Sequence, residues 1–290
     1  MDTKFSSIVN KTMEKYGLPP WVKPYVFEYI KGNPMGAIRH ATSFVEIRRK
    51  KGEITREYVR LPNGLTFKID FIEEVLSLFH YGEERIDEIY GRWSKEPGYD
   101  NLERKKHFAE LSQLSKRHLR AIKNLMEGIG IQQRQPRRGV VELFDYISSL
   151  KDWDDRILAS GIFIKYSFSF PFGLVFYKVF YPVAPEFMRS FGKAFTVKTD
   201  ATQWLEAESK RIAFEKRDSE HLRELADQLL SRISSSISSE ESLAKSSGIS
   251  GEIKLLRDVS VAYPLHVLSE LGSPIDVDKK VKAITRKRAA

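Results

Sequence analysis

The sequence predicts a mainly α-helical protein with an up-down four-helix bundle core, a small N-terminal β-hairpin and an extra C-terminal helix. Two observations carry this prediction: long stretches place apolar residues at helical spacing, and short turn signals separate them. Hydrophobic residues make up 41% and charged residues 30% of the 290-residue chain, which is typical of a folded globular protein. We divide the chain into an N-terminal appendage (1–69), a helical bundle (70–235) and a C-terminal segment with a flexible junction, a short helix and a basic tail (236–290).

Residues 1–69 do not show the long helical pattern of the core. Up to residue 40 the sequence suggests two short helices, broken near Pro19 and again near Pro34. From Phe44 to Ile69, β-branched and aromatic residues with turn signals between them predict a hairpin or three short strands. A helix that ends near Gly52 is the alternative, because the apolar residues before it do not alternate strictly.

Residues 70–128 predict two long helices joined as an antiparallel hairpin. Asp70 and Glu73 have the spacing of a capping box at the start of the first helix, and apolar residues as far as Trp93 recur at helical spacing. Pro97 and the following glycine end this helix, and Asp100 caps the second. Two helices of similar length with a short turn between them pack side by side in opposite directions.

A third helix is expected to start near Val140 and to pass Trp153 into the most apolar part of the chain. Residues 163–181 contain nine aromatic side chains. The stretch approaches the length of about 20 apolar residues that a membrane span needs. Lys165, the serines and Pro171 argue against a span, and a broken helix that lines an apolar cavity fits better.

A fourth helix is expected to run from about Thr202 past Leu229 into a serine-rich stretch. That stretch has the composition of a flexible or frayed junction. One more helix follows, interrupted by Pro264, and the basic tail comes after it.

The residue inventory excludes several kinds of chemistry. The chain has no cysteine, so disulfides, zinc–thiolate sites, iron–sulfur clusters and thiol nucleophiles are ruled out. It also has no P-loop, no paired-glycine dinucleotide fingerprint and no Gly-x-Ser-x-Gly elbow, which argues against a nucleotide-driven enzyme. The first residues mix acids and bases without an apolar run, so we expect no secretory signal and a cytoplasmic location.

Positive charge gathers at the end of the chain. The 48 basic and 39 acidic residues leave a net charge of +9, which favours anionic partners. The tail carries six cations: Lys279, Lys280, Lys282, Arg286, Lys287 and Arg288. A smaller cluster is Arg134, Arg137 and Arg138. A solvated tail and loop are the ordinary explanation, and contact with a nucleic acid or another polyanion is the alternative.

Acid and histidine residues recur one helical turn apart, as His80-x-x-Glu83 and as Asp218-x-x-His221. His118 lies on the predicted helix between these pairs. An offset of three residues puts two side chains on one helix face, which is how helical bundles direct ligands to a metal in their core. Solvated surface neighbours have the same spacing, so a metal site and an ordinary surface both stay open.

Four segments resemble the ferritin-like superfamily and, more loosely, its oxygenase branch of phenylacetyl-CoA epoxidase-type and tRNA-hydroxylase-type proteins. They are FHYGEERIDEIYGRW, KRHLRAIKNLMEGIGI, DWDDRILASGIFIKYSF and DSEHLREL, and the resemblance covers about Asp70 to Leu230. It implies a four-helix bundle in which two helices each give a Glu, and two others each give a Glu-x-x-His pair, to two metal ions.

The resemblance implies four ligands for iron or manganese: Glu83, His118, Asp218 and His221. The set is incomplete, because Ser115 stands where the Glu partner of His118 is expected. On the third helix, Lys165 or Tyr166 falls near the expected carboxylate, and a buried lysine there would place an ion pair at the metal position. The aromatic stretch is more commonly part of a core; the alternative is a substrate pocket formed by Tyr166, Phe168, Phe172 and Phe176.

Three functions follow from these patterns. We rank first a degenerate, metal-free ferritin-like protein that acts as a scaffold or partner subunit, in a homo-oligomer or with another protein, because Ser115 and Lys165 replace two carboxylates. The first alternative is an iron- or manganese-dependent oxidase or hydroxylase of an apolar substrate. The second is a basic helical protein that binds nucleic acid or a ribonucleoprotein through its tail. A membrane partner is not expected.

Overall fold

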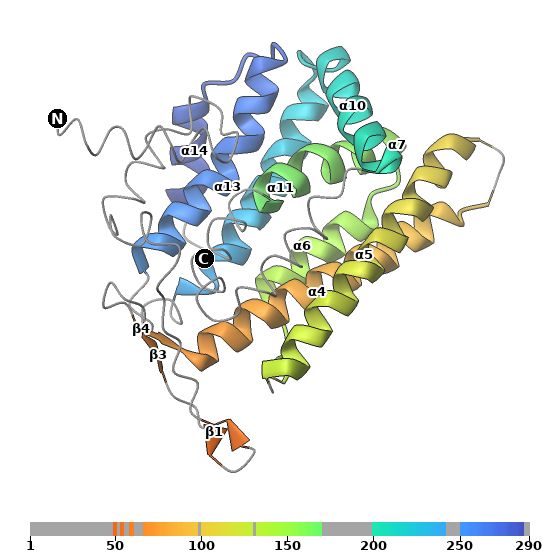
Figure 1. Ribbon diagram of the computed structural model, residues 1–290. Coiled ribbons are helices and arrows are strands. Elements are labelled where there is room, and N and C mark those ends of the chain that lie inside the picture. The colour runs from red at the N-terminus through yellow and green to blue at the C-terminus, as the bar shows by residue number, and fades with distance from the viewer. Residues whose placement is uncertain are drawn as a thin grey trace, which may run out of the picture.

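The computed structural model confirms a mainly helical protein (Figure 1). It describes residues 49–50, 53–54, 58–60, 66–97, 100–129, 132–169, 199–241 and 250–286. The short helices expected before residue 40 lie outside these ranges, as do Phe172, Phe176, Lys287 and Arg288. Within the described ranges, no helix is both long and apolar enough to cross a membrane.

Two long helices, α4 (Ile69–Ser94) and α5 (Leu102–Ile129), form the antiparallel hairpin that the sequence predicts (Figure 1). Three buried aromatic rings interlock near its turn: Tyr90 and Trp93 of α4 lie 5.0 and 5.2 Å from Phe108 of α5, between ring centroids. Both contacts are edge-to-face, a geometry that adds about 0.5–1.5 kcal/mol beyond burial. These rings therefore fix the register of the two helices.

The predicted third helix is in fact three elements: α6 (Arg138–Ser149), α7 (Trp153–Leu158) and a π-helix, η2 (Ala159–Ser169). The chain becomes extended at Leu150, and Asp152 then caps α7 by accepting hydrogen bonds from the backbone N–H groups of Asp154 and Asp155. The prediction of one helix that continues past Trp153 is wrong here. The Asp152 carboxylate accepts hydrogen bonds from free backbone N–H groups and so begins a new helix.

The predicted fourth helix is also divided, into α10 (Asp200–Glu215) and α11 (Glu220–Ser238). The hydroxyl of Ser219 accepts a hydrogen bond from the backbone N–H of Leu222 and so begins α11. Asp218 therefore lies in the turn before α11 and does not share a helix with His221. The serine-rich stretch continues α11 up to Ser238, because its isoleucines are buried, so this part is not a flexible junction. Residues 242–249 lie outside the described ranges.

Helix α13 (Ser250–Glu270) contains Pro264 and runs through it without a break. Proline has no N–H to offer the carbonyl four residues earlier, that of Ser260. The buried hydroxyl of Ser167 in η2 donates to this carbonyl at 2.7 Å. The hydrogen bond that the proline removes is thus replaced from a neighbouring helix, which explains why Pro264 does not interrupt α13.

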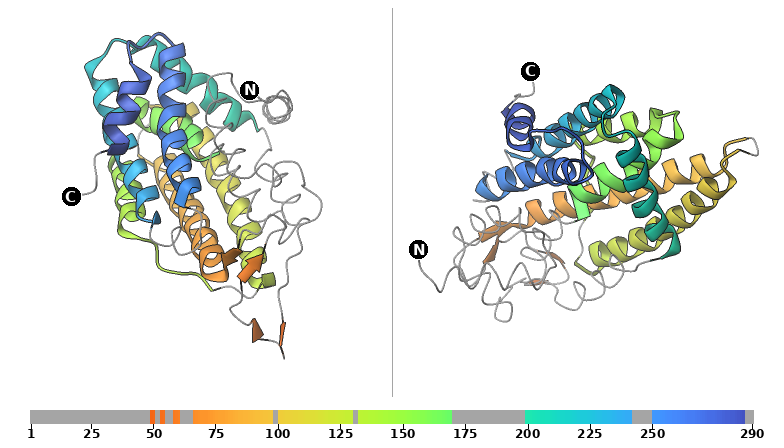
Figure 2. Two further views of the ribbon diagram at one scale, coloured as in Figure 1. Left: turned by 90° about the vertical axis from the view of Figure 1, so that its left-hand side faces the viewer. Right: turned by 90° about the horizontal axis from the view of Figure 1, so that it is seen from above.

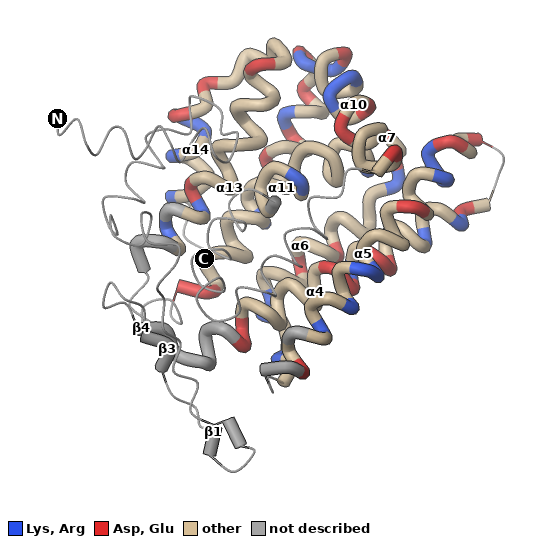
Figure 3. Tube along the Cα trace, in the orientation of Figure 1, with Lys and Arg blue, Asp and Glu red and all other residues tan. Residues whose placement is uncertain are grey.

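Most of the expected basic tail is a further helix, α14 (Val277–Arg286), which buries Val281 and Ile284. It packs on α13 and α11, and α13 also packs against η2. The middle of α13, residues 259–269, carries no Lys, Arg, Asp or Glu and forms an uncharged stretch in Figure 3. Seen from above, in the right view of Figure 2, α4 lies between α5 on one side and the helices α13 and α14 on the other.

Four short strands precede α4: β1 (Arg49–Lys50), β2 (Glu53–Ile54), β3 (Tyr58–Arg60) and β4 (Thr66–Lys68). They form two antiparallel pairs, β1 with β2 and β3 with β4. The residues that connect them lie outside the described ranges, so a hairpin appendage as a structural unit stays a prediction.

Candidate functional site

A largely apolar cavity of about 140 Å³ lies between α4, α6, η2, α11 and α13. Its walls are aliphatic and aromatic side chains, among them Leu78, Phe79, Ile86, Phe144, Ile237 and Leu256. Gly82 adds to the space, because a Cβ atom at this position would point to the ring of Phe144 at 3.5 Å. An apolar cavity of about 150 Å³ in another protein binds benzene. The space here is thus of the size that takes a single six-membered ring.

Three carboxylates border this apolar space: Glu74 and Glu83 on α4, and Glu240 just beyond α11. Of the lining residues that the structure describes, only these three are charged, and all three are acidic. Glu74 and Glu240 are buried, with 6% and 7% of their surface exposed. A buried carboxylate is costly unless a cation or a hydrogen-bond donor reaches it.

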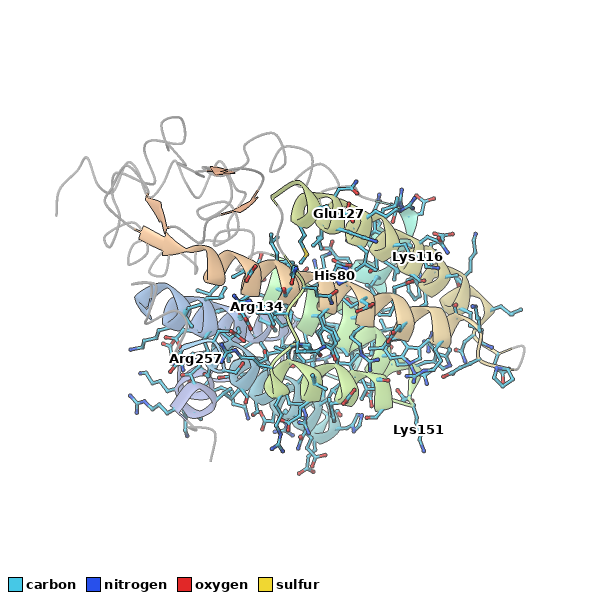
Figure 4. The ribbon with its side chains drawn as sticks, turned by 90° about the horizontal axis from the view of Figure 1, so that it is seen from below. His80, Lys116, Glu127, Arg134, Lys151 and Arg257 are labelled. Atoms are coloured by element: carbon cyan, nitrogen blue, oxygen red, sulfur yellow. The ribbon has the colours of Figure 1, made fainter. Side chains whose placement is uncertain are left out.

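Arg137 lies between the two buried carboxylates. Its Nε is 3.3 Å from Oε1 of Glu74 and 3.0 Å from Oε2 of Glu240. Arg134, labelled in Figure 4, donates from Nε to Glu73 at 2.8 Å and lies 3.8 Å from Glu74. These two members of the predicted basic cluster therefore bind glutamates of the protein itself.

Glu240 has an unusual affinity for its proton. Burial raises the pKa of this carboxyl to about 7, and the neighbouring Glu74 adds to the rise, while the Arg137 guanidinium opposes it. The carboxyl is therefore divided between its neutral and its charged form near neutral pH.

Replacing Glu240 with glutamine is expected to remove a pH-dependent loss of stability. The folded-state pKa is raised above the unfolded value of about 4.3, so the wild-type protein loses stability as the pH rises from about 4 to 7. A glutamine side chain does not titrate. The difference in the free energy of unfolding between Glu240→Gln and wild type, measured by urea unfolding, should grow from near zero at about pH 4 to as much as about 3 kcal/mol at about pH 8. A difference that does not change with pH would contradict a neutral, buried carboxyl.

The structure brings together two of the four proposed metal ligands. Nδ1 of His118 on α5 lies 3.1 Å from Oε1 of Glu83 on α4, and both side chains are nearly buried. Since Glu83 also borders the cavity, this pair lies at the edge of the apolar space. Ser115 is buried on α5, one turn before His118.

The other two proposed ligands do not join this pair. Asp218 is 75% exposed and contacts Arg217, while His221 binds Asp155 of α7, with 2.8 Å between Nε2 and Oδ1. The cap at Ser219 separates Asp218 from the helix of His221. In the described part of the chain, no group of three or more His, Asp or Glu residues could hold a metal ion. The residues that the structure describes therefore do not make up a two-metal centre.

Lys165 binds Glu206 of α10 at 2.6 Å, not Glu83 or Asp218. Tyr166 donates to the other oxygen of Glu206 at 3.2 Å, and Lys210 lies 2.8 Å from it. Burial opposes ionisation of Glu206, but hydrogen bonds from the two lysines lower its pKa to about 2. Lys165 is thus part of a local ion cluster and does not replace a metal.

The expected substrate pocket is formed only in part by the expected residues. Phe168 borders the cavity, whereas Tyr166 packs on Tyr263 of α13, with 5.0 Å between ring centroids. In the basic tail, Lys280 binds Asp227 of α11 at 2.5 Å. Lys279, Lys282 and Arg286 lie on the same helix, α14, and a polyanion site there stays a prediction.

Comparison with protein-family models, curated proteins and solved structures found no match for this chain. The candidate site therefore rests on geometry. Sequence reasoning missed Glu74, Glu240 and Gly82. The capping box expected at Asp70 and Glu73 is not formed, because α4 already begins at Ile69 and Glu73 binds Arg134. A second glutamate beside Glu73, within an apolar helix face, could have indicated Glu74. No local signal marks Glu240, because its burial depends on α4 and on the loop that carries Arg137.

Proposed function

We propose that this protein is a helical-bundle scaffold that holds a small apolar molecule in the cavity between α4, α6, η2, α11 and α13. The cavity is the observation that carries the proposal. Protein interiors are close-packed, and an unfilled space lowers stability. A space of about 140 Å³ with apolar walls has the size and lining of a site for one small apolar ring.

We also propose that the bundle is ferritin-like and lacks a working two-metal centre. The protein then acts as a cytoplasmic scaffold or partner subunit. Two features support the resemblance to the ferritin-like superfamily: the α4–α5 hairpin and the contact between Glu83 and His118. In that superfamily two helices of the bundle supply metal ligands at these positions. The positions of Asp218 and His221 argue against the oxidase alternative, because neither contacts this pair.

Protein purified from iron-supplemented culture should contain less than about 0.1 metal ion per chain. One or more iron ions per chain would restore the oxidase alternative.

Toluene is expected to bind the wild-type protein and to raise its melting temperature, since a ligand that binds the folded state stabilises it. Gly82→Leu should abolish this effect, because the added side chain occupies the space beside Phe144. Gly91→Ala is the control: it changes a glycine of the same helix that does not line the cavity. Calorimetry and thermal unfolding measure both effects. Equal binding by wild type and Gly82→Leu would place the toluene elsewhere.

A further inference from the structure

We propose that the outer face of α5 binds the phosphate backbone of a double-stranded nucleic acid. This surface is distinct from both the cavity and the basic tail. Two observations lead to it: exposed cations with no acid among them, and like charges placed where they repel one another.

The second half of α5 carries four exposed cations, and residues 111–126 contain no Asp or Glu. We call these four the α5 basic face: Lys116, Arg117, Arg120 and Lys123. At about 100° per residue they lie within about 120° of the helix circumference, and they cover about 10 Å along its axis. The right view of Figure 2 shows α5 at the edge of the described helices, beside α4. The four side chains therefore form one basic surface on the outside of the α4–α5 hairpin.

The protein itself neutralises little of the charge on the α5 basic face. Its two arginines form no ion pair with any residue that the structure describes. Its two lysines have distant partners: Nζ of Lys116 (Figure 4) lies 3.8 Å from Oδ1 of Asp87, and Nζ of Lys123 lies 4.0 Å from Oε1 of Glu127. In the second pair 67% and 65% of the side chains are exposed, and exposed pairs contribute little. A phosphate therefore meets cations that are available for binding.

The α5 basic face also places like charges next to one another. Residues three or four apart are neighbours on a helix, and like charges at these offsets destabilise it. Arg120 has three such neighbours: Lys116 and Arg117 before it and Lys123 after it. On α10, by contrast, Arg211 binds one glutamate three residues before it and another four residues after it. An ordinary solvated face has this second pattern, whereas the repulsion on α5 is relieved when an anion binds.

The chemistry of the face favours a duplex over other polyanions. Guanidinium groups bind phosphate oxygens with paired hydrogen bonds, and the exposed amides of Gln113 and Asn124 extend the face at its two ends. Proteins bind single strands by stacking bases on aromatic rings, but Phe108, the one Phe, Tyr or Trp of α5, is fully buried. A helix that binds a membrane surface inserts its apolar face, whereas that of α5 packs against α4.

Fluorescence anisotropy with a labelled DNA duplex of about 20 base pairs, at about 50 to 200 mM salt, tests the proposal. Four phosphate contacts predict a slope of about −3.6 in a plot of log K against log salt concentration. The single strand of the same sequence should bind at least about fivefold more weakly at about 50 mM salt. Vesicles that contain about 30% phosphatidylserine should not bind the protein in a sedimentation assay.

The double variant Arg117→Gln/Arg120→Gln should lower the affinity for the duplex about tenfold or more at about 50 mM salt, and make the salt slope shallower by about two. The matched control is Lys282→Gln/Arg286→Gln, which removes the same charge from exposed positions on α14. This control should lower the affinity less than about threefold, because distant charges are screened. All four side chains are exposed, so both variants should keep the melting temperature of the wild type.

Several outcomes overturn the proposal. Equal losses in the two variants assign binding to net charge, and a loss confined to the α14 variant assigns it to the basic tail. Tighter binding of the single strand, or binding of the vesicles that the α5 variant abolishes, assigns the face to another partner. No binding of the duplex at about 50 mM salt also excludes it. None of these outcomes depends on toluene in the cavity, so the proposed function stands or falls separately.

Discussion

Replacing Gly161 with alanine is expected to lower the free energy of unfolding by about 3 kcal/mol or more, since overpacking a well-packed core typically costs about 1–3 kcal/mol when side chains can move. Gly161 lies in η2, directly against α10. A Cβ atom here would lie 2.8 Å from the backbone oxygen of Leu205, and 2.5 and 2.6 Å from the Oγ and Cβ of Ser209. A backbone oxygen and a Cβ cannot rotate away, so one of the two helices must move.

Urea unfolding followed by circular dichroism measures this effect. Gly91→Ala is the matched control, because its Cβ would meet only the Ser112 hydroxyl at 3.5 Å, an ordinary contact. This control should leave stability unchanged or raise it by up to about 1 kcal/mol, the helix-propensity difference between glycine and alanine. If Gly161→Ala is as stable as Gly91→Ala, η2 does not pack on α10 as closely as described.

The second large effect is expected at Arg156, whose replacement by methionine should cost about 3 kcal/mol, as for removal of one partner from a buried ion pair. Only 5% of Arg156 is exposed. Its two terminal nitrogens each donate to a carboxylate oxygen of Glu96 at 2.7 Å, and Nε donates to the backbone oxygen of Leu150 at 2.9 Å. The guanidinium also lies over the rings of Trp93 and Trp153, at 5.1 and 4.8 Å from their centroids.

We expect Arg156→Met to cost about 3 kcal/mol, the low end of the range for breaking a buried ion pair. The side chain of Glu96 is 33% exposed, so its carboxylate gains hydration when its partner is lost. Arg156→Lys should cost about 2 kcal/mol, since lysine keeps the charge but loses the paired hydrogen bonds. Arg138→Lys should change stability by less than about 0.5 kcal/mol, because this side chain is 92% exposed. Urea unfolding compares all three variants. Equal costs for Arg156→Lys and Arg138→Lys would show that the paired geometry contributes nothing.

Helical periodicity located α4 and α5 correctly, because both are long and have one apolar face. It failed where two helices meet without a change in that periodicity. Apolar residues continue through Asp152 and Ser219, and these short polar side chains begin new helices by bonding to backbone N–H groups. The capping residues are visible in the sequence, but they do not by themselves tell a helix end from a polar residue on a solvated face. This is why the spacing of Asp218 and His221 suggested a shared helix face that does not exist.

The candidate site could be predicted even less well than the fold. Glu83 and His118 were found because ligand-type residues on neighbouring helices of a hairpin meet at a position that the turn determines. The environment of Glu240 instead depends on contacts with Glu74 and Arg137, both about 100 residues or more earlier in the chain. The cavity itself is the space left between five separate elements. No local pattern describes such a space.

The cavity can be tested most directly by methyl NMR of isoleucine-labelled protein during a titration with toluene. Ile86, Ile164, Ile237 and Ile253 line the cavity, whereas Ile212 and Ile284 are buried elsewhere in the core. A ring inside the cavity should shift the methyl signals of the four lining residues and leave those of the other two unchanged. Unchanged lining signals, or shifts spread equally over all six, would contradict a ligand site at this position.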